Sequence, residues 1–487
     1  MESKENLTKK ALKAGSFYIV VQFIVRGLSF LVTPIYTRLL TTEQYGIVKI
    51  FESWLLIMVP IVTLGLFRSV EVAKYDYRER FNEYVSSIVK LGLILCIGFS
   101  VICLVAKDFV CKILDFTPWM LYIMLVYIFA EFAIMAFQRR EKQMMRYKNT
   151  VIFTSVFVPI SIFVSVALLI YGNKNGATDE MLFYRIGGYY IPYVLAGIFI
   201  AIVVMLQGKS NTLVEDWKYG LKFSIPLIAE LVSIQIMNQI DKIMIQKMVG
   251  DSQAGIYSLA TTISYIIWII EDSVWGAWQP WLYEKLDRNE ESDINKPWNM
   301  MMHLFGIISI GLVAIAPEII LILGGTNYKA AVYLIAPLVV STLFRFYSYS
   351  FSAVQNYQKK TKFVAIATVI VMMFNVVANY VGIKIWGYVA AAYATTFSYF
   401  VLIIVLAIFE KKVTRKIIMP FRKTILIALA YFGVCELFIL TYNLHFTIRY
   451  VLIIIVLLAF FFINRKSLFA LLKMLKKKEK NSRVEDV

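Results

Sequence analysis

The sequence is poor in the charged side chains that cover soluble domains. Charged residues make up only 17% of its 487 residues and hydrophobic side chains make up 60%, whereas a soluble domain is typically about 25% charged and about half apolar. The mean hydropathy of +0.69 points the same way. About 20 apolar residues cross a bilayer, so this chain has room for many crossings. A large soluble catalytic domain is therefore excluded.

Cysteine and histidine are also scarce. The four cysteines include no Cys-x-x-Cys pair, and the only two histidines, His303 and His445, lie far apart in sequence. This pattern disfavours a disulfide framework, a His-based metal site and a His-based catalytic triad. The P-loop motif is absent as well, so no ATP site of that type is expected. We expect no cofactor, and any energy that the protein uses would come from an ion gradient (Na⁺ or H⁺), the membrane potential, the substrate gradient or a partner.

Apolar runs of about 20 residues recur along the whole chain. They are continuous rather than alternating, which indicates helices rather than strands. The fold class predicted is an all-α polytopic membrane protein with about 14 transmembrane helices. The predicted spans are 15–39, 44–66, 85–106, 118–138, 150–171, 183–206, 220–247, 256–279, 298–323, 329–354, 363–384, 386–409, 424–442 and 446–464.

The basic residues are distributed unevenly over the loops. If the N-terminus is placed inside, most of the 50 Lys and Arg residues fall in segments on that side, including 139–148, 411–416 and the tail from Arg465. This is the asymmetry of the positive-inside rule. We expect a multi-pass protein of the cytoplasmic (inner) membrane with both termini cytoplasmic. The net charge of +18 is then explained by topology and attraction to anionic lipid, so no nucleic-acid partner is expected.

A short motif occurs in two turns. The turn after the first span reads TTEQYGI (41–47), and the turn after the seventh reads GDSQAGI (250–256). Six crossings separate them, and an even number returns the chain to the same side of the membrane. The two halves are therefore predicted to have the same orientation.

Two predicted helices, one in each half, have polar side chains along one face, including an arginine near mid-membrane. A charged group there must face protein or water, and a guanidinium is suited to bidentate binding of phosphate. Arg26 and Arg345 are therefore candidate substrate ligands, although helix packing through Ser, Thr and Arg–Glu pairs is the alternative. The two faces carry Gln22, Arg26, Ser29 and Thr33 in the first span, and Ser341, Arg345, Ser348 and Ser352 in the tenth.

Acidic side chains lie inside the seventh and eighth spans. Glu230 and Asp241 share one helix face, and Glu271 and Asp272 follow in the next helix. These four carboxylates are candidate coupling-ion ligands or counter-ions. No metal site is predicted from them. Lys49 and Glu52, one turn apart near the outer side, are expected to form a local ion pair.

Two segments carry a family resemblance. The opening, KAGSFYIVVQFIVRGLSFLVTPIYTRLLTTEQYGIVKIFESW, resembles the start of the polysaccharide repeat-unit flippases of the Wzx type (O-antigen, capsule or teichoic-type). These belong to the multidrug/oligosaccharidyl-lipid/polysaccharide exporter superfamily. The segment LKFSIPLIAELVSIQIMNQIDKIMIQKMVGDSQAGIYSLA resembles the family's repeat of that element. The matching positions are Thr37, Arg38, Tyr45, Gly46, Pro226, Asp241, Lys242, Gly255 and Tyr257.

The resemblance implies two pseudo-symmetric six-helix lobes, at 1–210 and 211–410, followed at 411–487 by two extra helices and a basic cytoplasmic tail. It implies a transporter rather than an enzyme, working by alternating access on undecaprenyl-diphosphate-linked oligosaccharide in surface polysaccharide assembly. The expected partners are this polyprenyl-diphosphate-linked glycan, membrane lipid and polysaccharide polymerase or assembly proteins.

Three alternatives stay open at this point. One is an ion-coupled multidrug antiporter of the same superfamily, with an acidic cavity that binds organic cations. Another is a flippase for the peptidoglycan lipid precursor. A membrane glycosyltransferase or polymerase is the third, but it would need a carboxylate-bearing extramembrane loop, and the loops here are short.

Overall fold

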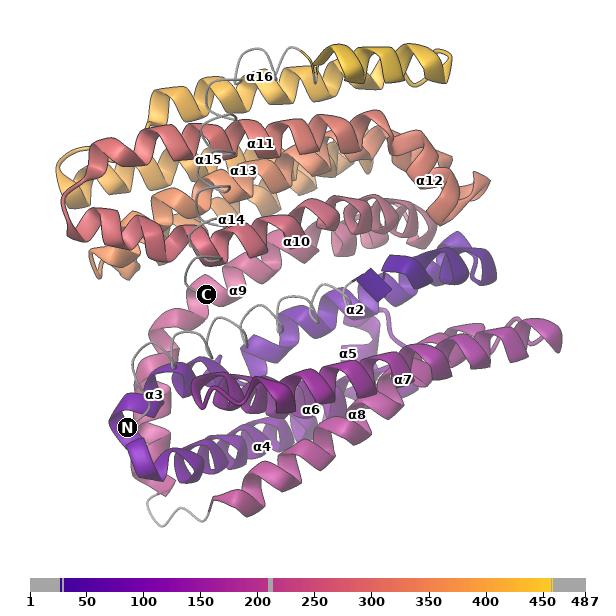
Figure 1. The fold of residues 1–487 in the computed structure, drawn as a ribbon. Helices are drawn as coiled ribbons and strands as arrows, with labels where there is room; N and C mark the ends of the chain where they lie inside the picture. Colours follow the sequence, from indigo (N-terminus) through magenta and orange to yellow (C-terminus); the bar gives the residue numbers. More distant parts are fainter. Residues whose placement is uncertain (1–26, 29, 209–212, 457, 459–487) are drawn as a thin grey trace, which may run out of the picture. The chain divides into compact units, whose positions relative to one another are not determined.

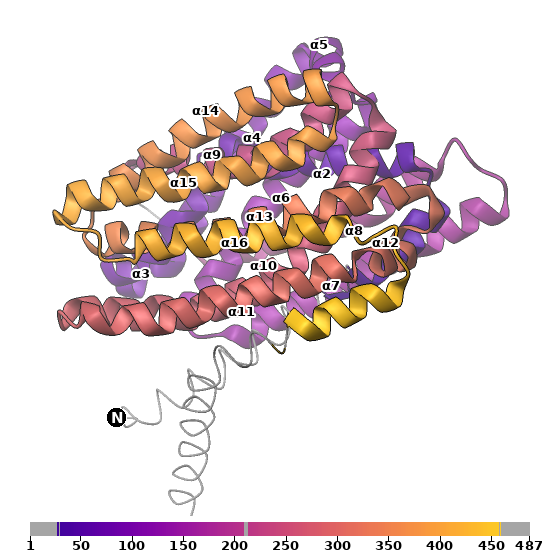
Figure 2. The same cartoon turned by 90° about the horizontal axis from the view of Figure 1, so that it is seen from above.

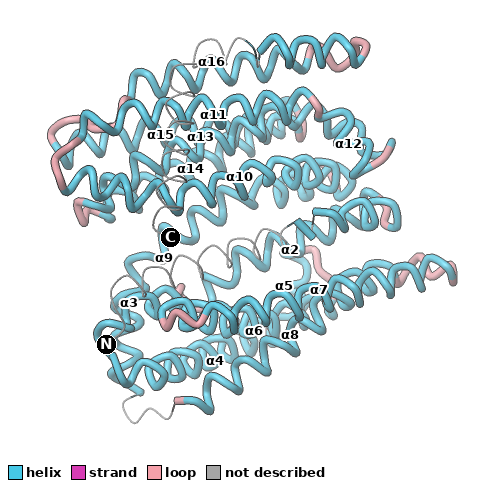
Figure 3. The backbone as a smooth tube through the Cα atoms, viewed as in Figure 1, coloured by secondary structure: helices cyan, strands magenta, loops and turns pink. Residues whose placement is uncertain are grey.

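The computed structural model describes residues 27–28, 30–208, 213–456 and 458, and this part of the chain is helical with no strand. Helix satisfies every backbone hydrogen bond within its own segment, as hydrocarbon demands. Figure 3 shows the helices joined by short loops. Residues 30–39 are helical. The helices that follow are α2 (Thr42–Val62), α3 (Ser69–Tyr77), α4 (Phe81–Val105), α5 (Lys107–Leu114), α6 (Pro118–Gln143), α7 (Tyr147–Lys174), α8 (Met181–Gln207), α9 (Leu213–Met248), α10 (Asp251–Asp287), α11 (Asn295–Ala314), α12 (Ala316–Gly324), α13 (Val332–Tyr357), α14 (Thr361–Trp386), α15 (Val389–Thr414) and α16 (Phe421–Ile439).

Eleven helical segments of the described residues are long and apolar enough to cross a membrane. They match, in order, the second to the twelfth predicted spans. The thirteenth coincides with α16, and 446–456, within the fourteenth, is a shorter apolar helix. Most of the first predicted span lies outside the described residues. The all-α polytopic prediction is confirmed, and the chain is a multi-pass membrane protein.

Helix ends follow local signals. Thr41 and Gln44 form a capping box ahead of α2, and Pro118 begins α6, where a missing N–H costs nothing. The predicted span 298–323 is wrong as a single helix, because α11 ends at Ala314 and α12 begins at Ala316. The break follows from Pro317, which has no backbone N–H and therefore cannot donate to the carbonyl of Val313, as a continuous helix would require.

Helices α9 and α10 are longer than predicted, with 36 and 37 residues. The hydropathy of the sequence places a boundary where the apolar run stops. The helix itself continues through the charged residues beyond, since Lys and Glu are good helix formers in water.

The chain folds into two compact units. The first unit comprises residues 1–262, 321–331 and 361–398, and the second comprises 263–320, 332–360 and 399–487. In the first unit α6, α7 and α8 lie side by side (Figure 1). Glycines allow close approach there, since a Cβ at Gly197 would stand 2.6 Å from that of Ala130. The lobe boundaries implied by the resemblance stay a prediction.

Helix α13 is the core of the second unit. In its most apolar 18-residue stretch 83% of the residues are buried, against 22% in that of α9. It packs against α11 and α16, and α16 lies beside α11 (Figure 2). A polar side chain on α13 is therefore enclosed by protein.

Candidate functional site

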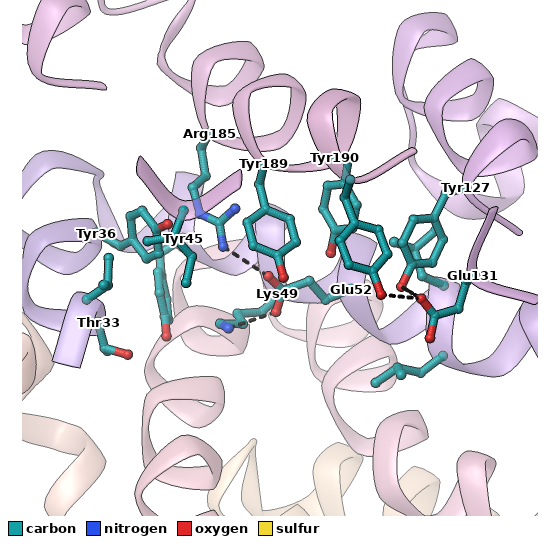
Figure 4. A pocket seen from close by; sticks show the side chains of 15 residues that line it. Thr33, Tyr36, Tyr45, Lys49, Glu52, Tyr127, Glu131, Arg185, Tyr189 and Tyr190 are labelled. Carbon is teal, nitrogen blue, oxygen red and sulfur yellow. Dashed lines mark hydrogen bonds and ion pairs between the residues drawn. The ribbon is translucent and has the colours of Figure 1, made fainter. Parts of the chain in front are cut away.

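The first unit contains a cavity of about 290 Å³ among α2, α6, α7, α8 and the helical residues before α2 (Figure 4). Polar and aromatic side chains predominate in its lining, although α2, α6, α7 and α8 are each apolar enough to span a membrane. It is lined by Val32, Thr33, Tyr36, Tyr45, Lys49, Glu52, Leu55, Leu56, Tyr127, Glu131, Ile162, Arg185, Tyr189, Tyr190 and Tyr193.

One carboxylate in this cavity bridges two cations. Glu52 Oε2 lies 2.7 Å from Lys49 Nζ, and Glu52 Oε1 lies 3.1 Å from a terminal nitrogen of Arg185. The ion pair expected between Lys49 and Glu52 is thus confirmed. Arg185 is only 5% exposed, and its guanidinium carbon lies 4.1 Å from the centre of the Tyr36 ring. Ion pairing and cation–π contact together compensate for burying this charge.

Sequence reasoning missed Arg185 as a site residue. A signal was present, because Arg185, Tyr189 and Tyr193 follow one another at intervals of four and so share a face of one helix. An arginine within an apolar run is by itself grounds to suspect function.

A second carboxylate is held by tyrosines. Tyr193 donates its hydroxyl proton to Glu131 over 2.8 Å, and Tyr127 donates to the same oxygen over 3.3 Å. The rings of Tyr189 and Tyr193 are stacked, with centroids 6.2 Å apart and planes within 12°. This side of the cavity therefore combines aromatic rings with a carboxylate.

Three buried polar atoms of the lining side chains have no hydrogen-bond partner among the residues that the structure describes. They are the hydroxyls of Tyr36 and Tyr45 and one terminal nitrogen of Arg185. Leaving such an atom unsatisfied costs about 1–3 kcal/mol. Polar groups of this kind are expected where a ligand or water completes the bonding.

The predicted polar face of the first span meets this cavity at one residue. Thr33 is buried and belongs to the lining. Gln22, Arg26 and Ser29 lie outside the described residues. Their role in substrate binding stays a prediction.

The predicted polar face of α13 lies in the second unit. Arg345, 4% exposed, donates to Glu271 over 2.9 Å, and its guanidinium carbon lies 3.9 Å from the Trp268 ring centre. The hydroxyls of Ser341 and Ser348 donate to carbonyls of their own helix. Arg345 thus has the carboxylate partner that the packing alternative requires, and its role in binding substrate stays a prediction.

The other membrane carboxylates are separated. Asp241 is buried in the first unit and accepts a hydrogen bond of 2.5 Å from Tyr257, while Glu230 on the same helix is partly exposed. In the second unit Asp272 is exposed and accepts from the Trp268 indole over 3.1 Å. Within the described part of the chain no three His, Cys, Asp or Glu side chains cluster as a metal site would require.

Comparison with known proteins bears on this architecture. The sequence profile of the polysaccharide biosynthesis protein family matches residues 11–286, and that of the MatE family matches 226–381. A protein of the Lsg locus of Haemophilus influenzae is 22% identical over 343 residues, covering 69% of this chain and 82% of the relative. An uncharacterized membrane protein of the same organism is 22% identical over 389 residues, covering 74% and 88%.

Solved structures share the fold. The lipid II flippase MurJ in an inward closed conformation has a TM-score of 0.64 at 15% identity and covers 92% of this chain and 99% of its own. An inward-facing MATE multidrug transporter of the MOP superfamily has a TM-score of 0.62 at 14% identity, with 83% and 99% covered. The fold is thus that of membrane transporters. The profile of the polysaccharide biosynthesis protein family matches more than half of the residues of this chain. The chain therefore belongs to that family, as the resemblance of its opening segment indicated.

Proposed function

We propose that this protein is a flippase that moves undecaprenyl-diphosphate-linked oligosaccharide units across the cytoplasmic membrane for surface polysaccharide assembly. The observation that carries the proposal is the family match over 11–286, because that segment contains every residue that lines the cavity of the first unit. No covalent bond is made or broken. The lobes expose the glycan to one side and then the other while the polyprenyl tail stays in lipid.

Crossing hydrocarbon with a charged diphosphate requires compensating donors throughout. Free ionised groups cost several kcal/mol in a bilayer, and arginine offers paired N–H donors to phosphate oxygens. In this proposal Arg26 and Arg345 hold the diphosphate. Release of Arg345 from Glu271 would accompany binding.

The driving force is proposed to be a coupling ion, Na⁺ or H⁺. The candidate ligands are the membrane carboxylates Glu230, Asp241, Glu271 and Asp272. The basic loops favour a cytoplasmic location of both termini, and in this proposal those loops are available to polymerase or assembly proteins.

The experiment is deletion of the gene followed by mass spectrometry of polyprenyl-linked oligosaccharides from intact cells and inner-membrane vesicles. We expect a complete repeat unit to accumulate on the cytoplasmic leaflet and surface polysaccharide to disappear. Wild-type protein supplied from a plasmid should restore both, which is the control. An unchanged lipid-linked pool would refute the proposal.

Two neighbouring functions have specific support. The MatE match over 226–381 favours an ion-coupled multidrug antiporter, which predicts that the deletion strain becomes sensitive to organic cations. The fold shared with MurJ favours a peptidoglycan-precursor flippase, which predicts that deletion is lethal. A viable strain with normal toxin resistance and lost polysaccharide is the result expected here.

A further inference from the structure

We propose, resting on the function proposed above, that the cavity of the first unit is the subsite for one uncharged sugar ring of the lipid-linked oligosaccharide. In this inference the diphosphate binds elsewhere. Four features carry the assignment: the charge balance of the cavity, its aromatic faces, its unsatisfied hydrogen-bonding groups and its size.

The charges in the cavity balance within it. Two cations, Lys49 and Arg185, share the carboxylate of Glu52, and both of its oxygens are engaged. The second carboxylate, Glu131, faces the same space. A diphosphate or a sugar carboxylate would meet two like charges and would compete with Glu52 for both cations, so the site disfavours an anion.

The aromatic lining has the shape that a sugar ring requires. A pyranose presents a flat apolar face of C–H groups and a rim of hydroxyls. Tyr189 and Tyr193, whose ring planes lie within 12° of parallel and which are both half-buried, line the cavity together. Aromatic side chains with a polar end suit a ligand that is apolar on its face and polar at its edge.

The hydrogen-bonding groups fit hydroxyls. A hydroxyl both donates and accepts. The terminal nitrogen of Arg185 and the hydroxyls of Tyr36 and Tyr45 are buried in the cavity wall without a partner, so a small movement of these side chains would bring them to a sugar hydroxyl. It can also donate to the carboxylate of Glu131. A phosphate carries acceptors only and would leave the carboxylate of Glu131 without a hydrogen-bond donor from the ligand.

The size limits the ligand to one ring. Ligand pockets range over about 300–1,000 Å³, and this cavity, at about 290 Å³, lies just below that range. It accommodates a single sugar unit rather than a whole oligosaccharide. The remaining sugars would lie outside it.

The test measures lipid binding to the purified full-length protein in nanodiscs by native mass spectrometry. The three probes are undecaprenyl diphosphate, undecaprenyl-diphosphate-N-acetylglucosamine and undecaprenyl diphosphate linked to glucuronic acid. Tyr189→Ala removes the aromatic face and Tyr189→Phe retains it. Phe199→Ala is the matched control, since Phe199 is an aromatic of the same helix that is 58% exposed and outside the lining.

We expect the wild-type protein to bind the N-acetylglucosamine lipid at least about fivefold more tightly than the lipid without sugar, which corresponds to about 1 kcal/mol. Tyr189→Ala should abolish that preference and leave the affinity for undecaprenyl diphosphate unchanged. The Phe variant and Phe199→Ala should keep it. If Tyr189→Ala does not assemble, Tyr189→Leu, which keeps apolar bulk, should give the same result.

Two outcomes would overturn the sugar subsite alone: an equal loss of affinity for all three lipids in Tyr189→Ala, or tighter wild-type binding of the glucuronic acid lipid than of the N-acetylglucosamine lipid. A wild-type protein that binds none of the three lipids would overturn the proposed function and the subsite with it. The failures are therefore distinguishable.

Discussion

Replacing Gly46 by alanine is expected to open the contact between α2 and α10 and to slow transport. Gly46 and Gly255 occupy the same position in the two repeated turns. A Cβ at Gly46 would stand 2.0 Å from the carbonyl oxygen of Asp251, and one at Gly255 would stand 2.2 Å from that of Thr42. Each turn thus places a backbone carbonyl over the glycine of the other, and Thr42 and Ser252 share a hydrogen bond of 2.8 Å.

The magnitude follows from these distances. Real Cβ contacts essentially never fall below 3.0 Å, so the alanine methyl must move the helices about 1 Å apart, and both clashing atoms belong to rigid helix ends. Overpacking of this kind costs about 1–3 kcal/mol, and the strained hydrogen bond adds about 0.5–1.5 kcal/mol. A total of about 2 kcal/mol or more changes the ratio of closed to open contact by about thirtyfold or more.

The assay is disulfide formation between Thr42→Cys and Ser252→Cys in membranes, in a chain whose four native cysteines are replaced by alanine. The hydroxyl oxygens lie 2.8 Å apart, so the paired thiols should cross-link readily when Gly46 is present. Gly46→Ala should lower the yield at least tenfold, in line with the free-energy estimate of about 2 kcal/mol. Surface polysaccharide should fall in parallel.

Gly98→Ala is the matched control. Gly98 lies in α4, and a Cβ there meets nothing within 4 Å. Both substitutions raise helix propensity by the same amount, roughly 0.5–1 kcal/mol, so their difference isolates the contact. Equal cross-linking in the two variants would refute the reasoning that these glycines are required for helix approach.

Three further outcomes are expected. Arg345→Ala leaves the buried carboxylate of Glu271 uncompensated and should lower the free energy of unfolding by about 3–5 kcal/mol, seen as a lower melting temperature in detergent. The double replacement Arg345→Met with Glu271→Leu should recover most of the lost stability, and no recovery would contradict ion pairing as the cause. Arg185→Ala should abolish surface polysaccharide, measured by immunoblot against an equal amount of membrane protein, and normal polysaccharide would show that the cavity is dispensable. Glu410→Ala removes the carboxylate that accepts from two backbone N–H groups of the loop before α16 and should cost about 1–3 kcal/mol, whereas an unchanged melting temperature would show that water replaces it.

Much of the fold could be predicted because the bilayer restricts the choices. Apolar runs of sufficient length must be helices, so the spans from 44–66 to 386–409 have counterparts in the structure, in order. The exception at 298–323 arose because hydropathy takes no account of backbone donors. Pro317 divides the span into two helices, and the Val313 carbonyl, to which Pro317 cannot donate, accepts from the Tyr442 hydroxyl over 2.7 Å. That partner is more than a hundred residues away.

The site could be predicted only in part. Spacing along one helix identified the pairing of Lys49 with Glu52, because the two lie one turn apart. It could not identify Arg185 as the second partner of Glu52, since these residues lie 133 positions apart on different helices. For Arg345 the sequence showed a buried cation but not which of several membrane carboxylates would neutralise it.

The sequence by itself determined that this protein is a membrane protein, where most of its helices run and which turns repeat. These properties depend on local composition and on the cost of unpaired backbone in hydrocarbon. Only the tertiary structure decided which polar side chains share a cavity. The stability of a buried charge depends on partners brought within about 3 Å by helix packing. The close approach of two helices depends on glycines, because the missing Cβ leaves room for backbone atoms of the other helix.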